Sequence, residues 1–236
     1  MLKKKPSKKK KRSGIVRTIL KVIYGFLAFT VFWVFVYRFV NPPVTWLMIE
    51  RGFERKFAGK DWKLEKEWKD FDELSSNLKL AAVAGEDANF LHHWGFDLKA
   101  IKTAYKKNKQ GTRKRGGSTI SQQVAKNVFL WPGRSWLRKG FEAYFTALIE
   151  IFWSKERILE VYLNVAEMGD GIYGAEAASR FYYHKSSSAL TKRQASLLIA
   201  ILPSPLRWSP VKPSPFVSRK AYLIRRNMKS VGKLKF

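Results

Sequence analysis

The chain has 236 residues, 46% of them hydrophobic and 15% aromatic, so it can build the core of about one globular domain and is not disordered as a whole. It contains no cysteine, which excludes disulfide bonds, thiolate catalysis and cysteine-ligated zinc. The formal net charge of +28 indicates an anionic partner: nucleic acid, an anionic membrane surface or a phosphate-bearing substrate. The alternative is that the charge serves solubility alone.

The N-terminus combines a basic tail, residues 1–13, with an apolar segment that we predict to be a transmembrane anchor over residues 14–40. Residues 22–37 carry no charge, and the Pro42-Pro43 pair ends the predicted helix. A cleaved signal peptide is the alternative, but the segment is long for one and no Ala-x-Ala-like site follows it. The positive-inside rule places the tail in the cytoplasm and the later residues outside, which removes nucleic acid as their natural partner.

The rest of the chain is predicted to be mainly α-helical, because strand-like alternation is almost absent. Residues 41–70 form a membrane-proximal segment that either lies at the membrane surface or is a solvated linker, and residues 71–236 form the main domain. Ser118 is the expected N-cap of a helix that buries Ile120, Val124 and Val128. A second helix is expected to bury Phe141, Phe145, Leu148 and Phe152. The helices are expected over residues 74–86, 118–128, 134–152, 155–164 and 191–202, with glycine turns at 116–117 and 169–174.

Four segments carry the residues suited to chemistry. The first, EDANFLHHWGFD from Glu86 to Asp97, ends an apolar stretch with two carboxylates, and an apolar and aromatic setting raises the proton affinity of a carboxylate, as a general base needs. The second, GGSTISQQVAKN from Gly116 to Asn127, places Ser118, Gln122 and Lys126 on one helix face suited to phosphate or sugar. An ordinary helix end and a capped, solvated helix are the structural alternatives.

The third segment, RSWLRKGFE from Arg134 to Glu142, gathers three cations near the start of a long helix, and an ion pair between Arg138 and Glu142 is its structural alternative. The fourth, KERILEVYLN from Lys155 to Asn164, is followed by spaced glycines and alone would indicate only a helix and a turn. In this order, the four segments resemble the motifs E-D-x-x-F-x-x-H-x-G-x-D, G-G-S-T-[IL]-[ST]-Q-Q, R-K-x-x-E and K-x-x-I-L-E-x-Y-L-N of the family 51 peptidoglycan glycosyltransferases, over about residues 71–210.

In bifunctional penicillin-binding proteins a related domain is fused to a transpeptidase, whereas this sequence stops near the end of the glycosyltransferase domain. Its tail, Leu202 to Trp208, also resembles the monofunctional branch of the family, so the sequence is similar to the monofunctional members of Gram-negative bacteria. The resemblance implies a lysozyme-like α domain with a small membrane-proximal lobe, held in the bacterial inner membrane with the catalytic domain in the periplasm. It also implies polymerisation of lipid II into β-1,4-linked glycan strands, with inversion at the anomeric carbon and release of polyprenyl pyrophosphate.

The resemblance assigns Glu86 as general base and Glu142 as the second catalytic carboxylate, which would either hold a divalent cation or orient the neighbouring cations. The residues it assigns to substrate binding are Ser118, Thr119, Gln122, Gln123, Lys126, Asn127, Arg134, Arg138 and Lys139. Glu160 and Asp87 are expected to be structural.

The sequence does not demand a cofactor, although Mg²⁺ or Mn²⁺ suits a phosphate substrate. The expected partners are lipid II, the nascent glycan strand, the lipid bilayer and other cell-wall synthesis or division proteins, but not nucleic acid. The rival functions are a lytic enzyme on a similar fold, which would not need a cation cluster, and a basic membrane scaffold, which would not need Glu86.

Overall fold

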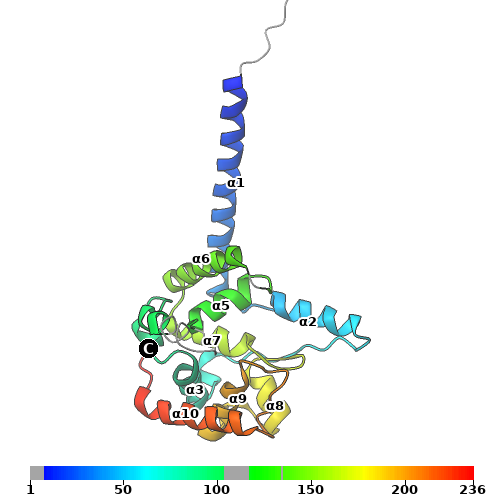
Figure 1. Cartoon of the computed structure of the whole chain (residues 1–236), viewed down its shortest axis with the longest axis vertical. Coiled ribbons are helices and arrows are strands. Elements are labelled where there is room, and N and C mark those ends of the chain that lie inside the picture. The colour runs from blue at the N-terminus through cyan, green and yellow to red at the C-terminus, as the bar shows by residue number, and fades with distance from the viewer. Residues whose placement is uncertain (1–7, 104–116, 134) are drawn as a thin grey trace, which may run out of the picture. The chain divides into compact units, whose positions relative to one another are not determined.

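A computed structural model describes residues 8–103, 117–133 and 135–236 of the chain, which divide into two compact units, Met1–Val40 and Asn41–Phe236. The first unit contains one helix, α1 (Lys8–Tyr37), drawn in blue in Figure 1. Its segment Gly14–Tyr37 is long and apolar enough to cross a membrane. The predicted apolar helix is therefore confirmed, ending close to the expected boundary.

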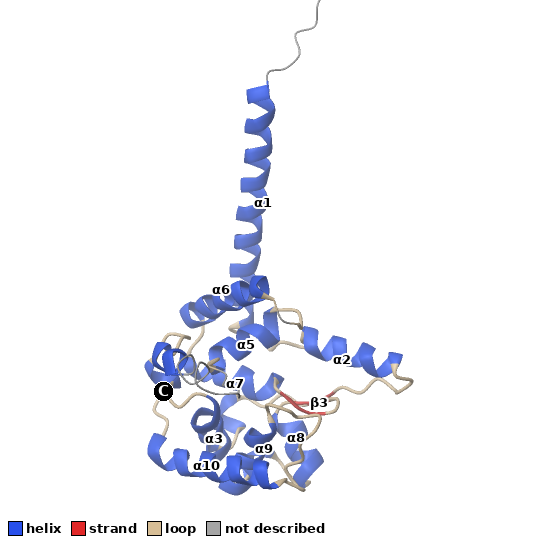
Figure 2. Ribbon diagram, viewed as in Figure 1, coloured by secondary structure: helices blue, strands red, loops and turns tan. Residues whose placement is uncertain are grey.

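The second unit is mainly α-helical, as predicted (Figure 2). The predicted helices correspond to α3, α5, α6, α7 and α9, whereas α2, α8 and α10 were not predicted as helices. Within residues 41–70, α2 is a helix that Thr45 caps and that buries Met48 and Gly52. The bounds are α2 (Trp46–Phe57), α3 (Ser76–Glu86), α5 (Ile120–Phe129), α6 (Trp136–Phe152), α7 (Lys155–Val165), α8 (Ala175–Tyr183), α9 (Lys192–Ile201) and α10 (Pro215–Val231). Three short 3₁₀ helices occur at Phe71–Glu73, Phe90–His92 and Ser187–Ala189.

A small sheet lies beside the helices, formed by β1 (Glu65–Lys66), β2 (Glu167–Gly169) and β3 (Ile172–Tyr173) in the order β1-β3-β2. β3 pairs parallel to β1 and antiparallel to β2. The predicted glycine turn connects these strands to α8. Gly174 has a φ of +80°, and a Cβ there would lie 2.7 Å from the backbone oxygen of Asn164, so only glycine fits.

The core forms where α7 packs against α5 and where α3, α9 and α10 pack against one another. α3 approaches its two neighbours closely at Gly85, where a Cβ would lie 2.9 Å from Ile199 and 3.1 Å from Ile224. Gly85 directly precedes Glu86, so this packing fixes the position of the carboxylate that ends α3.

Two local predictions need correction. The N-cap of α5 is Thr119 rather than Ser118, because the Thr119 hydroxyl accepts from the Gln122 N–H and Gln122 Oε1 accepts from the Thr119 N–H. The predicted buried face of α5, with Ile120, Val124 and Val128, is confirmed.

In α6 the predicted stripe is only half right, since Phe145 and Leu148 are buried but Phe141 and Phe152 are only half-buried. The buried face of this helix also holds the carboxylates of Glu142 and Glu150, each paired with a cation.

Candidate active site

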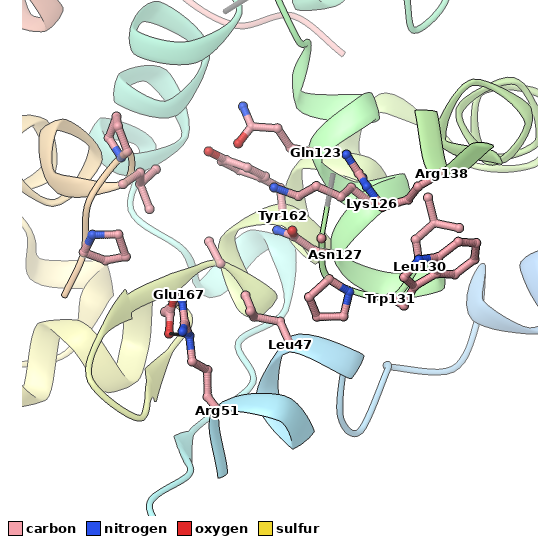
Figure 3. A pocket seen from close by; sticks show the side chains of 16 residues that line it. Leu47, Arg51, Gln123, Lys126, Asn127, Leu130, Trp131, Arg138, Tyr162 and Glu167 are labelled. Atoms are coloured by element: carbon pink, nitrogen blue, oxygen red, sulfur yellow. Dashed lines mark hydrogen bonds and ion pairs between the residues drawn. The ribbon is translucent and has the colours of Figure 1, made fainter. Parts of the chain in front are cut away.

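A cleft of about 520 Å³ opens between α2, α5 and the start of α6, with the end of α7 as its floor. Figure 3 shows how its side chains lie. On one side α5 contributes Gln123, Lys126 and Asn127, and α6 contributes Arg138. These three α5 residues are spaced i, i+3 and i+4, which puts them on one face of the helix. One face of one helix therefore supplies amide groups and a cation to the same cleft.

Glu86 ends α3 beside this face. Its Oε2 accepts a hydrogen bond from Gln123 Nε2 at 3.1 Å, and its Oε1 lies 3.4 Å from Lys220 Nζ. The side chain is 14% exposed, so a ligand can reach it from only a narrow range of directions. Gln123 thus connects the carboxylate to the cleft, and its neighbour Lys126 lies about one helical turn, roughly 5 Å, further along α5.

The predicted cation cluster is organised by Glu142. Its Oε2 accepts from Arg138 Nη1 at 3.1 Å, and its Oε1 is paired with Lys139 Nζ. The Glu142 side chain is only 4% exposed. The ion pair expected between Arg138 and Glu142 is therefore present, and it directs the Arg138 guanidinium towards the cleft.

Lys126 lies in an unusual electrostatic setting. Partial burial of its ammonium by the cleft walls lowers its pKa, the nearby cations Arg138 and Lys139 lower it further, and Glu142 opposes the shift. The residue still lines the cleft and remains accessible to a ligand. An anion bound there would restore the charge balance that the protein alone leaves incomplete.

The remaining predicted binding residues are placed differently. Thr119 and Gln122 are buried and form the capping box of α5, and Thr119 also donates to the carbonyl of Gly95 at 2.6 Å. Ser118 is exposed and does not line the cleft, and Lys139 reaches it only through Glu142. Arg134 lies outside the described residues. The structure therefore gathers Gln123, Lys126, Asn127 and Arg138, whereas Thr119 and Gln122 fix the start of the helix.

Asp87, the neighbour of Glu86, ties the first and second motifs together. Its Oδ1 lies 2.9 Å from His93 Nε2, and its Oδ2 accepts the backbone N–H of Ile120 at 3.0 Å. Burial raises the pKa of Asp87, and the bonds from His93 and Ile120 oppose that shift. Asp87 therefore holds the start of α5 against the end of α3.

Glu160 is also structural. Its carboxylate is paired with Arg157 at 2.6 Å and accepts the backbone N–H of Phe71 at 3.2 Å. It does not line the cleft.

The transglycosylase family model matches residues 55–229 of the sequence. The chain belongs to the transglycosylase family. It is 50% identical over 220 residues to a biosynthetic peptidoglycan transglycosylase of Pseudomonas putida strain W619, with 93% of both chains covered. It is 51% identical over 218 residues to a protein of the same name from Pseudomonas syringae pv. tomato, with 92% of both chains covered. The chain is therefore a glycosyl-transferring enzyme, and the family resemblance of its motifs is confirmed.

This transglycosylase has residues in the cleft, or beside Glu86, that the sequence alone did not single out. Lys220 comes from α10, 134 residues after Glu86, in a basic stretch with no motif. Tyr162 belongs to the fourth motif, and its buried hydroxyl has no hydrogen-bond partner among the described residues.

Opposite the cations, Arg51 Nε and Glu167 Oε1 form a pair at 3.1 Å (Figure 3). Burial raises the pKa of Glu167, while Arg51 opposes the shift. Of Lys220, Tyr162, Arg51 and Glu167, only Tyr162 belongs to a sequence motif, the fourth.

The surroundings of Glu142 do not fit a divalent cation. Both carboxylate oxygens already accept from Arg138 and Lys139, whose charges would repel a metal ion. Among the described residues no group of three or more histidines and carboxylates is arranged to hold one. Of the two roles left open for Glu142, the geometry favours orientation of the cations.

Proposed function

We propose that this transglycosylase polymerises lipid II into β-1,4-linked peptidoglycan glycan strands, with Glu86 as general base. The observation that supports the proposal most directly is the bond between Gln123 and Glu86, which places the carboxylate beside the cleft that Lys126 and Arg138 line. The names of the Pseudomonas relatives point to the same polymer. A base beside a cationic cleft is the arrangement that glycosyl transfer from a pyrophosphate needs.

In the proposed reaction, a hydroxyl of the incoming lipid II attacks the anomeric carbon of the growing strand. The hydroxyl proton moves to the Glu86 carboxylate as the new C–O bond forms. The bond to the pyrophosphate breaks on the opposite face, and the leaving group takes the electron pair. Attack opposite the leaving group converts an α-linkage into a β-linkage, so the reaction inverts the anomeric carbon.

The leaving pyrophosphate needs neutralisation of its charge rather than a proton, and the cations of the cleft are suited to that task. Lys126 and Arg138 line the cleft, and Lys139 shares the carboxylate of Glu142 with Arg138. Gln123 and Asn127 offer amide groups to sugar or phosphate oxygens. We assign Glu142 the role of holding the two cations in place, and no step passes through a metal ion.

Lipid II is confined to the bilayer, so an enzyme that uses it benefits from attachment to the same membrane. We propose that α1 is a single-pass anchor in the inner membrane, with the N-terminus in the cytoplasm and residues 41–236 in the periplasm. Large apolar side chains on two helices of the second unit are solvent-exposed and suit contact with lipid. They are Trp46, Phe53 and Phe57 of α2 and Trp136, Leu137 and Ile151 of α6.

The deciding experiment is polymerisation of labelled lipid II by the detergent-purified full chain and its Glu86→Gln variant. We expect long glycan from the wild type and a rate about 10²–10⁴-fold lower from Glu86→Gln, because glutamine cannot accept the proton. Glu73→Gln is the matched control, since Glu73 is an exposed carboxylate in the 3₁₀ helix that precedes α3, the helix that Glu86 ends. Equal rates for Glu86→Gln and Glu73→Gln would remove Glu86 from the mechanism.

The lytic alternative is tested in the same preparation. Purified peptidoglycan incubated with the wild type should release no soluble fragments. Fragment release without polymer from lipid II would contradict the proposed direction of the reaction.

A further inference from the structure

The C-terminal part of the sequence is positively charged and contains no acidic residue of its own. Thirteen Lys and Arg residues follow Glu176, and no Asp or Glu does. Many exposed charges on proteins simply face solvent, so the position of these cations decides whether they form a site. Four of them gather around one hollow.

This basic hollow, about 290 Å³ in volume, lies between α10, α3 and the first residue of α9. Lys192, Arg225, Arg226 and Lys229 line it together with Tyr222, and Leu80 and Met228 form its apolar part. Tyr222, Arg225, Arg226 and Lys229 are spaced i, i+3, i+4 and i+7, so they share one face of α10. A hollow with four cations, an exposed ring and no carboxylate is suited to an anionic ligand with some apolar surface.

In the part of the chain that the structure describes, none of the four cations of the basic hollow is paired with a carboxylate. Arg225 donates to the Ser196 hydroxyl at 3.0 Å, a neutral partner. Among the described residues, neither Lys192, Arg226 nor Lys229 forms an ion pair, whereas Lys220 on the same helix is paired with Glu86. Their mutual repulsion is therefore left uncompensated, and a bound polyanion would relieve it.

The position of the hollow argues against a lipid headgroup as its ligand. Within the second unit, α6 lies at one end and α10 at the other (Figure 1). Among the described residues of the second unit, the two most exposed large apolar side chains are Phe57 of α2 (89%) and Trp136 of α6 (92%), whereas those of α10, Phe216, Tyr222 and Leu223, are 53%, 58% and 38% exposed. The end that carries the basic hollow therefore faces away from the surface on which the bilayer is expected.

We propose that the basic hollow binds the carboxylate groups of the peptides that the glycan strand carries. This assignment of the ligand rests on the proposed function, because lipid II carries a pentapeptide on its disaccharide and the strand made from it keeps that peptide. Leu80 in the hollow precedes Glu86 by six residues, which is about 9 Å along the axis of α3 and about a third of a turn around it. An extended peptide covers about 3.3–3.6 Å per residue, so a peptide of a few residues spans that distance. The peptide would hold the strand beside the enzyme after each transfer.

The test measures binding of fluorescent, uncross-linked glycan strands with intact peptides to the full chain in a neutral detergent, by fluorescence anisotropy. The Arg226→Glu/Lys229→Glu variant should bind about tenfold or more weakly, because two attractive charges become repulsive. Arg226→Gln/Lys229→Gln should show a smaller loss in the same direction. The matched control is Lys56→Glu/Lys60→Glu, which makes the same charge change at exposed residues of α2 and the turn after it and should bind within about twofold of wild type.

Three results would overturn the proposal. One is equal affinity of the hollow and control variants for the strands. Another is undiminished binding of strands whose peptides an amidase has removed. The last is that the hollow variants bind peptide-bearing strands as well as the wild type does, but bind anionic vesicles or nucleic acid more weakly.

Because the strands are made beforehand, this binding requires no turnover. A failure of the proposed function appears separately, as absence of polymer from lipid II with the wild type.

Discussion

Glu86 and Glu142 are both carboxylates near cations, but their surroundings suit different tasks. Glu86 accepts one amide hydrogen bond and faces one ammonium beside an open cleft. Glu142 is buried, and both of its oxygens are occupied by cations. These surroundings fit the proposed roles, in which Glu86 receives the proton of the substrate hydroxyl and Glu142 positions the neighbouring cations.

We expect Glu142→Gln to lower kcat/KM for lipid II by at least about tenfold, because the amide no longer neutralises two adjacent cations and their side chains separate. The informative measurement compares this variant with wild type treated with a chelator. If Glu142 orients cations, the chelated wild type keeps far more activity than the variant. Equal losses that Mg²⁺ or Mn²⁺ reverses in the wild type would show instead that Glu142 holds a metal ion.

The pH dependence of kcat/KM should reflect the loss of the proton from the Lys126 ammonium. Since its pKa is lowered, this lysine loses its proton at a lower pH than an ordinary lysine does. The cleft then loses a positive charge, so kcat/KM should fall on the alkaline side as pH rises through that pKa. In Lys126→Arg the cation stays protonated, and the fall should move to higher pH whatever the absolute rate. An unchanged alkaline limb in the pH profile would exclude Lys126 as its source.

Among the helices, the contact of α3 with α9 and α10 controls where Glu86 lies. Gly85→Ala should lower the free energy of unfolding by about 1–3 kcal/mol, because its Cβ would lie 2.9 Å from Ile199 Cγ2 and 3.1 Å from Ile224 Cδ1. Gly140→Ala in α6 is the control, since no atom lies within 4 Å of its Cβ position. That change should stabilise the helix by up to about 1 kcal/mol. Chemical denaturation of the two variants measures both effects, and equal stabilities would contradict the packing seen here.

The helices that the sequence predicted are those whose ends carry legible signals, such as the Thr191 cap and Pro203 stop of α9. α10 was missed although Ser214 caps it, because its cations hide the weak apolar spacing of Val217, Ala221, Ile224 and Met228. In the site, motif resemblance pointed to Gln123, Lys126 and Arg138, which do line one cleft. It did not reveal Lys220 or Arg51, since both depend on contacts between distant parts of the chain.

For the second unit as a whole, the apolar end formed by α2 and α6 should bind membranes by itself. A fragment of residues 41–236 should therefore co-sediment with vesicles, and Leu137→Asp should weaken that association by introducing a charge at a 68% exposed leucine. Val211→Asp, at a 49% exposed valine on another part of the unit, is the matched control. If both variants bind vesicles equally, the apolar end is not the membrane-facing surface.

The packing of α10 on α3 also has a consequence for the biosynthesis of the enzyme. Lys220 and Ile224, which contact Glu86 and Gly85, are translated more than 130 residues after them. At about 5–20 residues per second, that separation corresponds to an interval on the order of 10 s. During that interval the base lacks its ion-pair partner and α3 lacks half of its packing surface. A nascent chain would therefore lack the complete surroundings of Glu86 until α10 has been synthesised and has packed against α3.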